Sequence, residues 1–215
     1  MADKKIKKPS IIKDALSLTI ITIICSFALA FVYELTKDPI KAQEDAKKNE
    51  AYEVVYEVAD SLSTDEELLQ VAKDMDLSSL DAKYAGITID DVIQAKDASG
   101  NVLGYIIKSN TRGYSSNISV AIGYSMDGVV QGIELLAIND TPGFGLELKN
   151  SEFIDRFKDV ATDQFKLTKG SASEPNEIDV YSGATITTEA VVNAVNAGLT
   201  FLTENVAKLG GVAVE

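Results

Sequence analysis

Residues 178–188 (IDVYSGATITT) place four hydroxyl side chains around a Gly-Ala pair, directly before an apolar helical pattern. The four are Ser182, Thr185, Thr187 and Thr188. A helix N-terminus stabilises a phosphate, because its unpaired N–H groups and the positive end of the helix dipole point there. Helix capping is the alternative, since Ser and Thr are favoured caps and one of the four must serve as one. Four hydroxyls exceed what a cap requires, so the segment predicts a phosphate or nucleotide site, although no Gly-Lys pair follows as in a Walker loop.

A second loop, residues 139–145 (NDTPGFG), combines two glycines with a proline between a strand pattern and a helix pattern. These residues fix a tight backbone path and leave N–H groups free to meet a flat or anionic ligand. An ordinary strand-to-helix turn explains the same residues equally well. The loop is therefore a second candidate site on sequence evidence alone.

The composition limits the chemistry that these loops could perform. The 215-residue chain has no histidine, no tryptophan and one cysteine. This excludes His-based nucleophilic machinery, His-ligated haem or zinc, Cys-ligated iron–sulfur clusters and an internal disulfide. The net charge of −13 argues against a nucleic-acid partner. Any redox function therefore requires a bound organic cofactor.

An apolar run without charges, residues 15–33, follows the lysine-rich residues 1–14. At 1.5 Å per residue the run spans roughly 28 Å, the thickness of a bilayer core. The run therefore predicts a transmembrane helix. The preceding lysines, by the positive-inside rule, predict that its N-terminus is cytoplasmic. A cleaved signal peptide ending at Ala28-Leu29-Ala30 is the alternative, but the run continues past that point. A lipoprotein cysteine at Cys25 is disfavoured because bulky Ile24 precedes it.

The next segment, residues 34–84, is expected to be membrane-proximal and helical. Asp38-Pro39 indicates a helix start, and Ser63 or Thr64 is the expected cap of a second, short helix. From residue 85 the period changes to two, and four strand patterns follow at 87–95, 102–109, 118–124 and 129–137. Short turns at 98–101 and 126–128 join them as two hairpins.

Helical spacing returns at 146–160. After a loop at 170–176 it appears again in a final helix, which follows residues 178–188 directly, has apolar positions from Val191 to Val206 and ends at Gly210-Gly211. Helices thus flank a run of strands and do not alternate with them. The predicted class is α+β, a mostly antiparallel sheet flanked by helices, with the domain spanning residues 85–215 after one N-terminal transmembrane helix.

The first candidate site resembles a known motif. Asp179-x-x-Ser182-Gly183-Ala184-Thr185-x-Thr187 is similar to the flavinylation motif D-x-x-[ST]-G-A-[TS]-x-T of covalent FMN proteins. The resemblance implies that a flavin transferase attaches FMN through its phosphate to the Thr187 hydroxyl. It also implies that Ser182 and Thr185 donate hydrogen bonds to the phosphate, and that Gly183 and Ala184 leave room for it.

The chain as a whole resembles the G subunit of Rnf-type ion-translocating oxidoreductases and the related C subunit of the sodium-pumping NADH:quinone reductase. The similarity extends to the loop Thr141-Pro142-Gly143-Phe144-Gly145, where Asp140 and Phe144 replace the Glu and Leu of the family. It implies that Thr141, Gly143 and Phe144 contact the flavin, with Phe144 stacking on its ring. The chain length favours the Rnf-type protein.

This resemblance implies a membrane-anchored electron-transfer subunit that is inert alone and works beside membrane and cluster-carrying subunits. The complex would couple electron transfer from ferredoxin to NAD with Na⁺ or H⁺ transport, and the flavin domain would face the extracytoplasmic side of the cell membrane. Two other functions stay open at this stage: a free-standing extracellular flavin reductase, and an anchored binding domain without a flavin.

Overall fold

A computed structural model describes residues 11–138, 145–170 and 172–206. The chain forms two compact units, an anchor unit of residues 1–46 and a globular unit of residues 47–215. In chain order the elements are α1 (Ile11–Val55), β1 (Ser61–Thr64), α2 (Glu66–Asp74), η1 (Leu77–Ser79), η2 (Ala82–Tyr84), β2 (Thr88–Lys96), β3 (Val102–Arg112), β4 (Asn117–Ser125), β5 (Val129–Ile138), η3 (Gly145–Lys149), α3 (Ser151–Ile154), η4 (Asp155–Phe157), β6 (Val160–Ala161), β7 (Lys166–Thr168), β8 (Glu177–Asp179) and α4 (Thr185–Val206).

Helix α1 contains the apolar run 15–33. Among the described residues it is the one helix long and apolar enough to cross a membrane, with a mean hydropathy of 2.5 over its best window and none of that window buried. Pro39 lies inside α1, so the helix start expected at Asp38-Pro39 is wrong. The polar stretch that follows has strong helix formers, and helix propensity outweighs the one backbone hydrogen bond that a proline removes.

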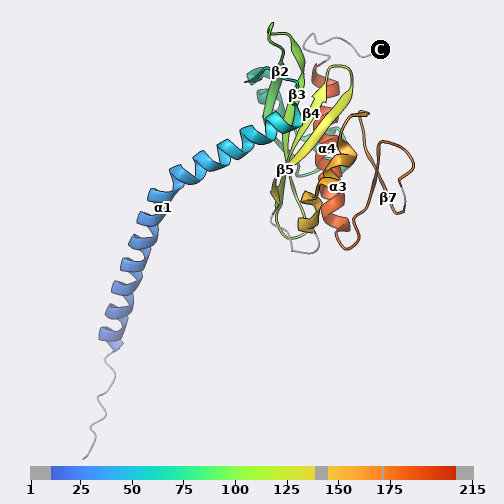
Figure 1. Ribbon diagram of the computed structural model, residues 1–215. Helices are drawn as coiled ribbons and strands as arrows, with labels where there is room; N and C mark the ends of the chain where they lie inside the picture. The colour runs from blue at the N-terminus through green and yellow to red at the C-terminus, as the bar shows by residue number, and fades with distance from the viewer. Residues whose placement is uncertain (1–10, 139–144, 171, 207–215) are drawn as a thin grey trace, which may run out of the picture. The chain divides into compact units, whose positions relative to one another are not determined.

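The main sheet has six strands in the order β1-β2-β3-β4-β5-β6, and all neighbouring strands are antiparallel. The two predicted hairpins are β2–β3 and β4–β5, and the strand ends agree with the predicted ones to within one residue, except that β3 continues to Arg112. The sheet and its flanking helices confirm the α+β class (Figure 1). A second sheet pairs the short strands β7 and β8 in parallel, on either side of the predicted loop 170–176.

The expected capping by Ser63 or Thr64 is wrong, because both residues lie in β1. The cap of α2 is Asp65, whose carboxylate accepts a hydrogen bond of 3.0 Å from the Leu68 N–H. The prediction of one helix at 146–160 is also wrong. The chain forms three short helical segments there, η3, α3 and η4. Aromatic side chains in and after these segments pack together, with ring centroids of Phe157 and Phe165 4.8 Å apart.

Helices cover both faces of the sheet. Helix α4 packs on one face, where Val191, Val195 and Leu199 are fully buried in the main core. The last turns of α1 pack on the other face, where Tyr52 and Val55 form a smaller core. Strand β3 contributes to both cores, because the side chains of consecutive residues in a strand point to opposite faces of the sheet. Thus Ile107 belongs to the α4 core and Ile106 to the α1 core.

Gly123 in β4 lets the end of α1 lie directly on the sheet. A Cβ at this position would come within 2.3 Å of the Val55 carbonyl oxygen. Real side chains essentially never approach a backbone oxygen so closely, so any other residue would push the end of α1 away from the sheet. The glycine therefore fixes where the last turns of α1 lie in the globular unit.

Ser109 of β3 gives a first prediction, on stability. Its side chain is fully buried beneath Gly198 of α4, and its hydroxyl has no hydrogen-bond partner among the described residues. Because an unpaired buried hydroxyl is unfavourable by about 1–3 kcal/mol, Ser109→Ala is expected to raise the free energy of unfolding by about 1 kcal/mol. Thermal or urea unfolding of the full chain in detergent measures the change.

The matched control is Ser119→Ala on the neighbouring strand, since the Ser119 hydroxyl donates a hydrogen bond to the Asn110 side-chain oxygen. That variant should lose stability, because a satisfied hydrogen bond is removed. Equal loss of stability in both variants would show that the Ser109 hydroxyl is paired after all.

Candidate functional site

The predicted phosphate site lies where β8 passes into α4. Asp179 ends β8, residues 180–184 form a turn, and Thr185 begins α4. Gly183 adopts a positive φ of 83°, which L side chains rarely take, and the Ala184 N–H donates to the Tyr181 carbonyl over 2.9 Å. The Gly-Ala pair thus makes a tight turn that delivers the chain into the helix.

Thr188 is the hydroxyl that secures the helix start. It donates to the Ala184 carbonyl over 2.9 Å, and it accepts a hydrogen bond of 3.3 Å from the Tyr181 N–H. Thr188 is fully buried and is the one hydroxyl of the four that lies outside the motif. The structural role expected of one hydroxyl therefore falls on this residue.

Ser182 and Thr185 are exposed at the start of α4. Neither side chain has a hydrogen-bond partner within 11–138, 145–170 and 172–206. Both can therefore donate to an anion. Ile186 between the motif positions is 54% exposed, so an apolar surface adjoins these hydroxyls. This arrangement suits a ligand with an anionic group and an apolar body.

Thr187 has a different environment from its neighbours in the motif. Its side chain is only 2% exposed, on the side of α4 that packs against the rest of the globular unit. A large modifying enzyme cannot reach a hydroxyl at that depth. Attachment of any group to Thr187 therefore requires local opening around the first turn of α4, or modification before this region closes.

Asp179, the first residue of the motif, ties three segments together. Its carboxylate accepts a hydrogen bond of 2.7 Å from the Thr168 hydroxyl of β7 and lies 3.5 Å from the Arg156 guanidinium. The Thr168 hydroxyl, then the Ala172 N–H and Arg156, hold the pKa of Asp179 below its ordinary value. Asp179 thus holds the turn in place.

Sequence reasoning missed Arg156. It lies 23 residues before Asp179, in a stretch where the sequence pattern predicts one regular helix. Its guanidinium also lies 4.0 Å from Glu152. The sequence offered one signal, since Arg156 is one of only two arginines in the chain. Arginine is the side chain best suited to carboxylates and phosphates.

A small cavity of about 140 Å³ adjoins the turn. Its lining includes Arg156, Asp179, Tyr181 and Ser182. Ligand pockets are typically roughly 300–1,000 Å³, so this cavity has room for an anionic group but not for a flavin ring system. The ring of such a ligand would have to lie outside it.

The lowered pKa of Asp179 gives a second prediction. A carboxyl whose pKa is depressed on folding contributes stability that is complete above its unfolded pKa of about 3.9. That contribution is lost as the pH falls through the lower folded pKa. Asp179→Asn should therefore be less stable than the wild type at pH 7, and the difference should shrink below about pH 4.

Urea unfolding of both chains between pH 3 and pH 7 measures this difference. Asp127→Asn, in the exposed turn between β4 and β5, is the control for loss of one negative charge. A stability gap for Asp179→Asn that is constant across the pH range would rule out the ion pair and hydrogen bonds as its source.

The second candidate loop is only partly covered by the structure. Thr141, Gly143 and Phe144 lie outside the described residues, and Gly145 begins η3 as a buried residue. Contact of this loop with a flavin ring stays a prediction.

Comparison with known proteins assigns the chain. Residues 1–55 match the RnfG N-terminal region and residues 113–200 match the FMN-binding domain. The G subunit of the ion-translocating oxidoreductase complex of Shewanella piezotolerans is 30% identical over 208 residues, which are 94% of each chain. The chain belongs to this G-subunit family.

Other relatives agree with the assignment. The G subunit of the Na⁺-translocating ferredoxin:NAD⁺ oxidoreductase complex of Acetobacterium woodii is 36% identical over 107 residues, which cover 47% of this chain and 50% of that one. The solved C subunit of the Na⁺-translocating NADH-quinone reductase of Parabacteroides distasonis has the same fold. Its TM-score is 0.51 at 16% identity, over 77% of this chain and 94% of that chain.

The family assignment bears on two parts of this chain. The apolar helix α1 makes it a membrane-anchored protein. The FMN-binding domain begins between β3 and β4 and ends within α4, so it contains the turn 180–184 and the hydroxyls at the start of α4. The donor set there fits the phosphate of FMN, because exposed hydroxyls and first-turn amides meet at one helix N-terminus.

Proposed function

We propose that this member of the G-subunit family is the flavin-carrying electron-transfer subunit of an Rnf-type complex that couples electron transfer between ferredoxin and NAD to Na⁺ or H⁺ transport. The family match over 94% of the chain carries the proposal. The absence of histidine and of paired cysteines from the sequence supports it, because electron transfer must then rest on an organic cofactor. The protein has no catalytic activity alone and works with the membrane and cluster-carrying subunits.

We further propose that FMN is bound covalently, through a phosphoester to the Thr187 hydroxyl, and that a flavin transferase forms this bond. When bound, FMN accepts electrons and passes them on. Ser182 and Thr185 donate hydrogen bonds to its phosphate, together with the first N–H groups of α4. Gly183 and Ala184 keep side chains away from this group, and the Thr141–Gly145 loop lies over the ring.

The surrounding residues hold the site in its closed form. The Asp179 carboxylate keeps the turn attached to β7 and to Arg156, so the first turn of α4 takes up a fixed position once FMN is attached and the region has closed. Thr188 prevents the helix start from fraying. A fixed donor set holds an anion more strongly than a flexible one, because less ordering entropy is lost.

The orientation follows from the charges that flank the apolar run. Lysines precede it in residues 1–14. We therefore place the N-terminus in the cytoplasm and the globular unit on the extracytoplasmic side of the cell membrane. A covalent bond suits that position, since a cofactor that dissociates outside the membrane is lost to the cell.

Flavin fluorescence of the denatured protein tests the proposal. The full chain is produced together with an active flavin transferase and run on a denaturing gel. A fluorescent band at the mass of the chain, with an FMN-phosphoryl adduct on the peptide containing residues 181–188, is expected. In the purified complex, reduced ferredoxin should bleach the flavin absorbance. A dark band, with the transferase active on another substrate, would refute the flavin assignment.

A further inference from the structure

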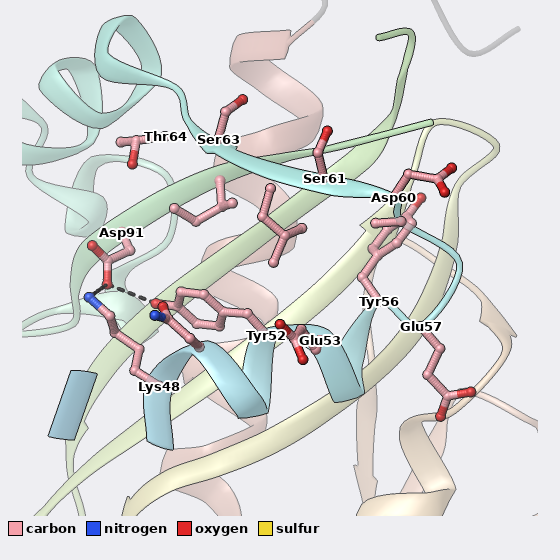
Figure 2. Close-up of a pocket in the computed structure, with 14 residues that line it drawn as sticks. Lys48, Tyr52, Glu53, Tyr56, Glu57, Asp60, Ser61, Ser63, Thr64 and Asp91 are labelled. Carbon is pink, nitrogen blue, oxygen red and sulfur yellow. Dashed lines mark hydrogen bonds and ion pairs between the residues drawn. The ribbon is translucent and has the colours of Figure 1, made fainter. Parts of the chain in front are cut away.

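A second cavity of the globular unit is lined by residues of the segment 48–64 and by two residues of β2, none of which belongs to the flavin motif at 179–187. It has a volume of about 600 Å³ and lies between the last turns of α1 and strand β1 (Figure 2). Both walls belong to the globular unit. We call this cavity the α1–β1 groove. Its lining consists of Lys48, Asn49, Tyr52, Glu53, Tyr56, Glu57, Ala59, Asp60, Ser61, Leu62, Ser63, Thr64, Asp91 and Ile93.

Strand β1 forms one wall and is the outermost strand of the main sheet. The Asp65 N–H donates to the Val92 carbonyl over 2.9 Å, so Asp65 faces β2. In an antiparallel pair the residues alternate between inward and outward backbone groups. The N–H and C=O groups of Leu62 and Thr64 therefore point to the open edge, where no backbone group of the described residues pairs with them.

The opposite wall is held rigid by a network on α1. The Tyr52 hydroxyl donates to the Asp91 carboxylate over 2.7 Å, and the Lys48 ammonium lies 3.5 Å from the same carboxylate (Figure 2). Burial, and then the hydrogen bond to Asp91, raise the pKa of Tyr52, so its hydroxyl remains a donor at physiological pH. The groove is thus formed before any ligand enters.

The groove carries a net negative charge. Four carboxylates line it against one ammonium group, that of Lys48. Glu57 pairs with Lys158 at 3.6 Å, outside the groove. The side chains of Glu53 and Asp60 are exposed and have no ion-pair partner in the part of the chain that the structure describes. Any ligand that lies in this groove gains from positive charge.

From this geometry we propose that the α1–β1 groove binds an extended, Lys- or Arg-bearing segment of another protein of the complex, which adds to β1 as a further strand. The inference rests on the proposed function, since it requires that the chain works within a complex. Main-chain hydrogen bonds to Leu62 and Thr64 supply affinity, and Glu53 and Asp60 select the basic side chains. A small anion is excluded by the negative charge, and a compact ligand leaves the free edge unpaired.

Photo-cross-linking in the assembled complex tests this proposal. A photoreactive amino acid replaces Asn49, an exposed residue on the α1 wall of the groove, in the full chain expressed in its own membranes. Mass spectrometry of the cross-linked peptides should identify a segment of one other protein of the complex with at least one Lys or Arg. Cross-links to lipid, or to a second copy of this chain, would overturn the proposal.

Thr64→Pro adds a sharper test, because proline removes the outward N–H of Thr64 and leaves the bonds to β2 intact. Ser63 before it is already extended, as a residue before proline must be. The cross-link yield should fall about tenfold, whereas the control Thr64→Val, which keeps the N–H, should leave it unchanged. An equal yield in both variants would contradict strand addition.

Charge reversal tests the choice of a basic partner independently, because it changes side chains and not the backbone. The double variant Glu53→Lys and Asp60→Lys changes two exposed side chains, and should lower the cross-link yield at least as much as Thr64→Pro. No loss of yield would overturn the choice of a basic partner. Covalent flavin is measured in every sample, so failure of the flavin assignment is seen separately from failure of the docking.

Discussion

Replacing Thr187 with alanine is expected to abolish covalent flavin in this chain. The variant lacks the hydroxyl at the last position of the motif, which is the one that would accept the phosphoryl group. The hydrogen bonds that secure the helix start belong to Thr188 and are kept in this variant. In-gel fluorescence of the denatured protein, produced with the transferase, should therefore drop from full intensity to background.

The neighbouring hydroxyls supply the matched controls. Thr185→Ala removes an exposed hydroxyl next to the attachment position, and should lower the rate of flavin incorporation without abolishing it. Thr187→Ser keeps an acceptor hydroxyl and should restore part of the signal. A fluorescent Thr187→Ala band, or a folded Thr187→Ser chain as dark as Thr187→Ala, would contradict attachment at Thr187.

The sequence was sufficient for the features that depend on local pattern. The apolar spacing of Val191, Val195 and Leu199 predicted α4, since one helix face packs against the sheet. Glycine-containing turns predicted the hairpins, because their backbone angles are available to few other residues. The motif at 179–187 also lies in consecutive residues, and the anion site that it indicates stays a prediction.

Features that depend on distant contacts were not predictable. Strand β1 has the short sequence SLST, which carries no clear strand pattern, and it is extended because it pairs with β2. The role of Arg156 depends on the return of β8 beside η4, which no local pattern encodes. Asp65 took the capping role expected of Ser63 or Thr64 because those residues are held extended by the sheet.

The role of Asn196 also depends on a distant contact, and its replacement is expected to have the largest effect on stability. It lies buried on α4, where its side-chain oxygen accepts from the Phe165 N–H and its side-chain nitrogen donates to the Phe165 carbonyl, both over 2.8 Å. This pair of bonds holds the segment before β7 against α4. Because Asn196→Leu leaves two buried backbone groups unpaired, it should lower the free energy of unfolding by about 3 kcal/mol.

Asn205→Leu on the same helix is the matched control. Asn205 is equally buried and donates to the Phe201 carbonyl over 2.8 Å, but that carbonyl also accepts the ordinary i−4 bond of the helix. Its loss therefore leaves no backbone group unpaired, and the expected change is below about 1 kcal/mol. Urea unfolding of the two variants compares them. Equal losses would mean that burial of an amide, and not the clamp on Phe165, determines the stability at position 196.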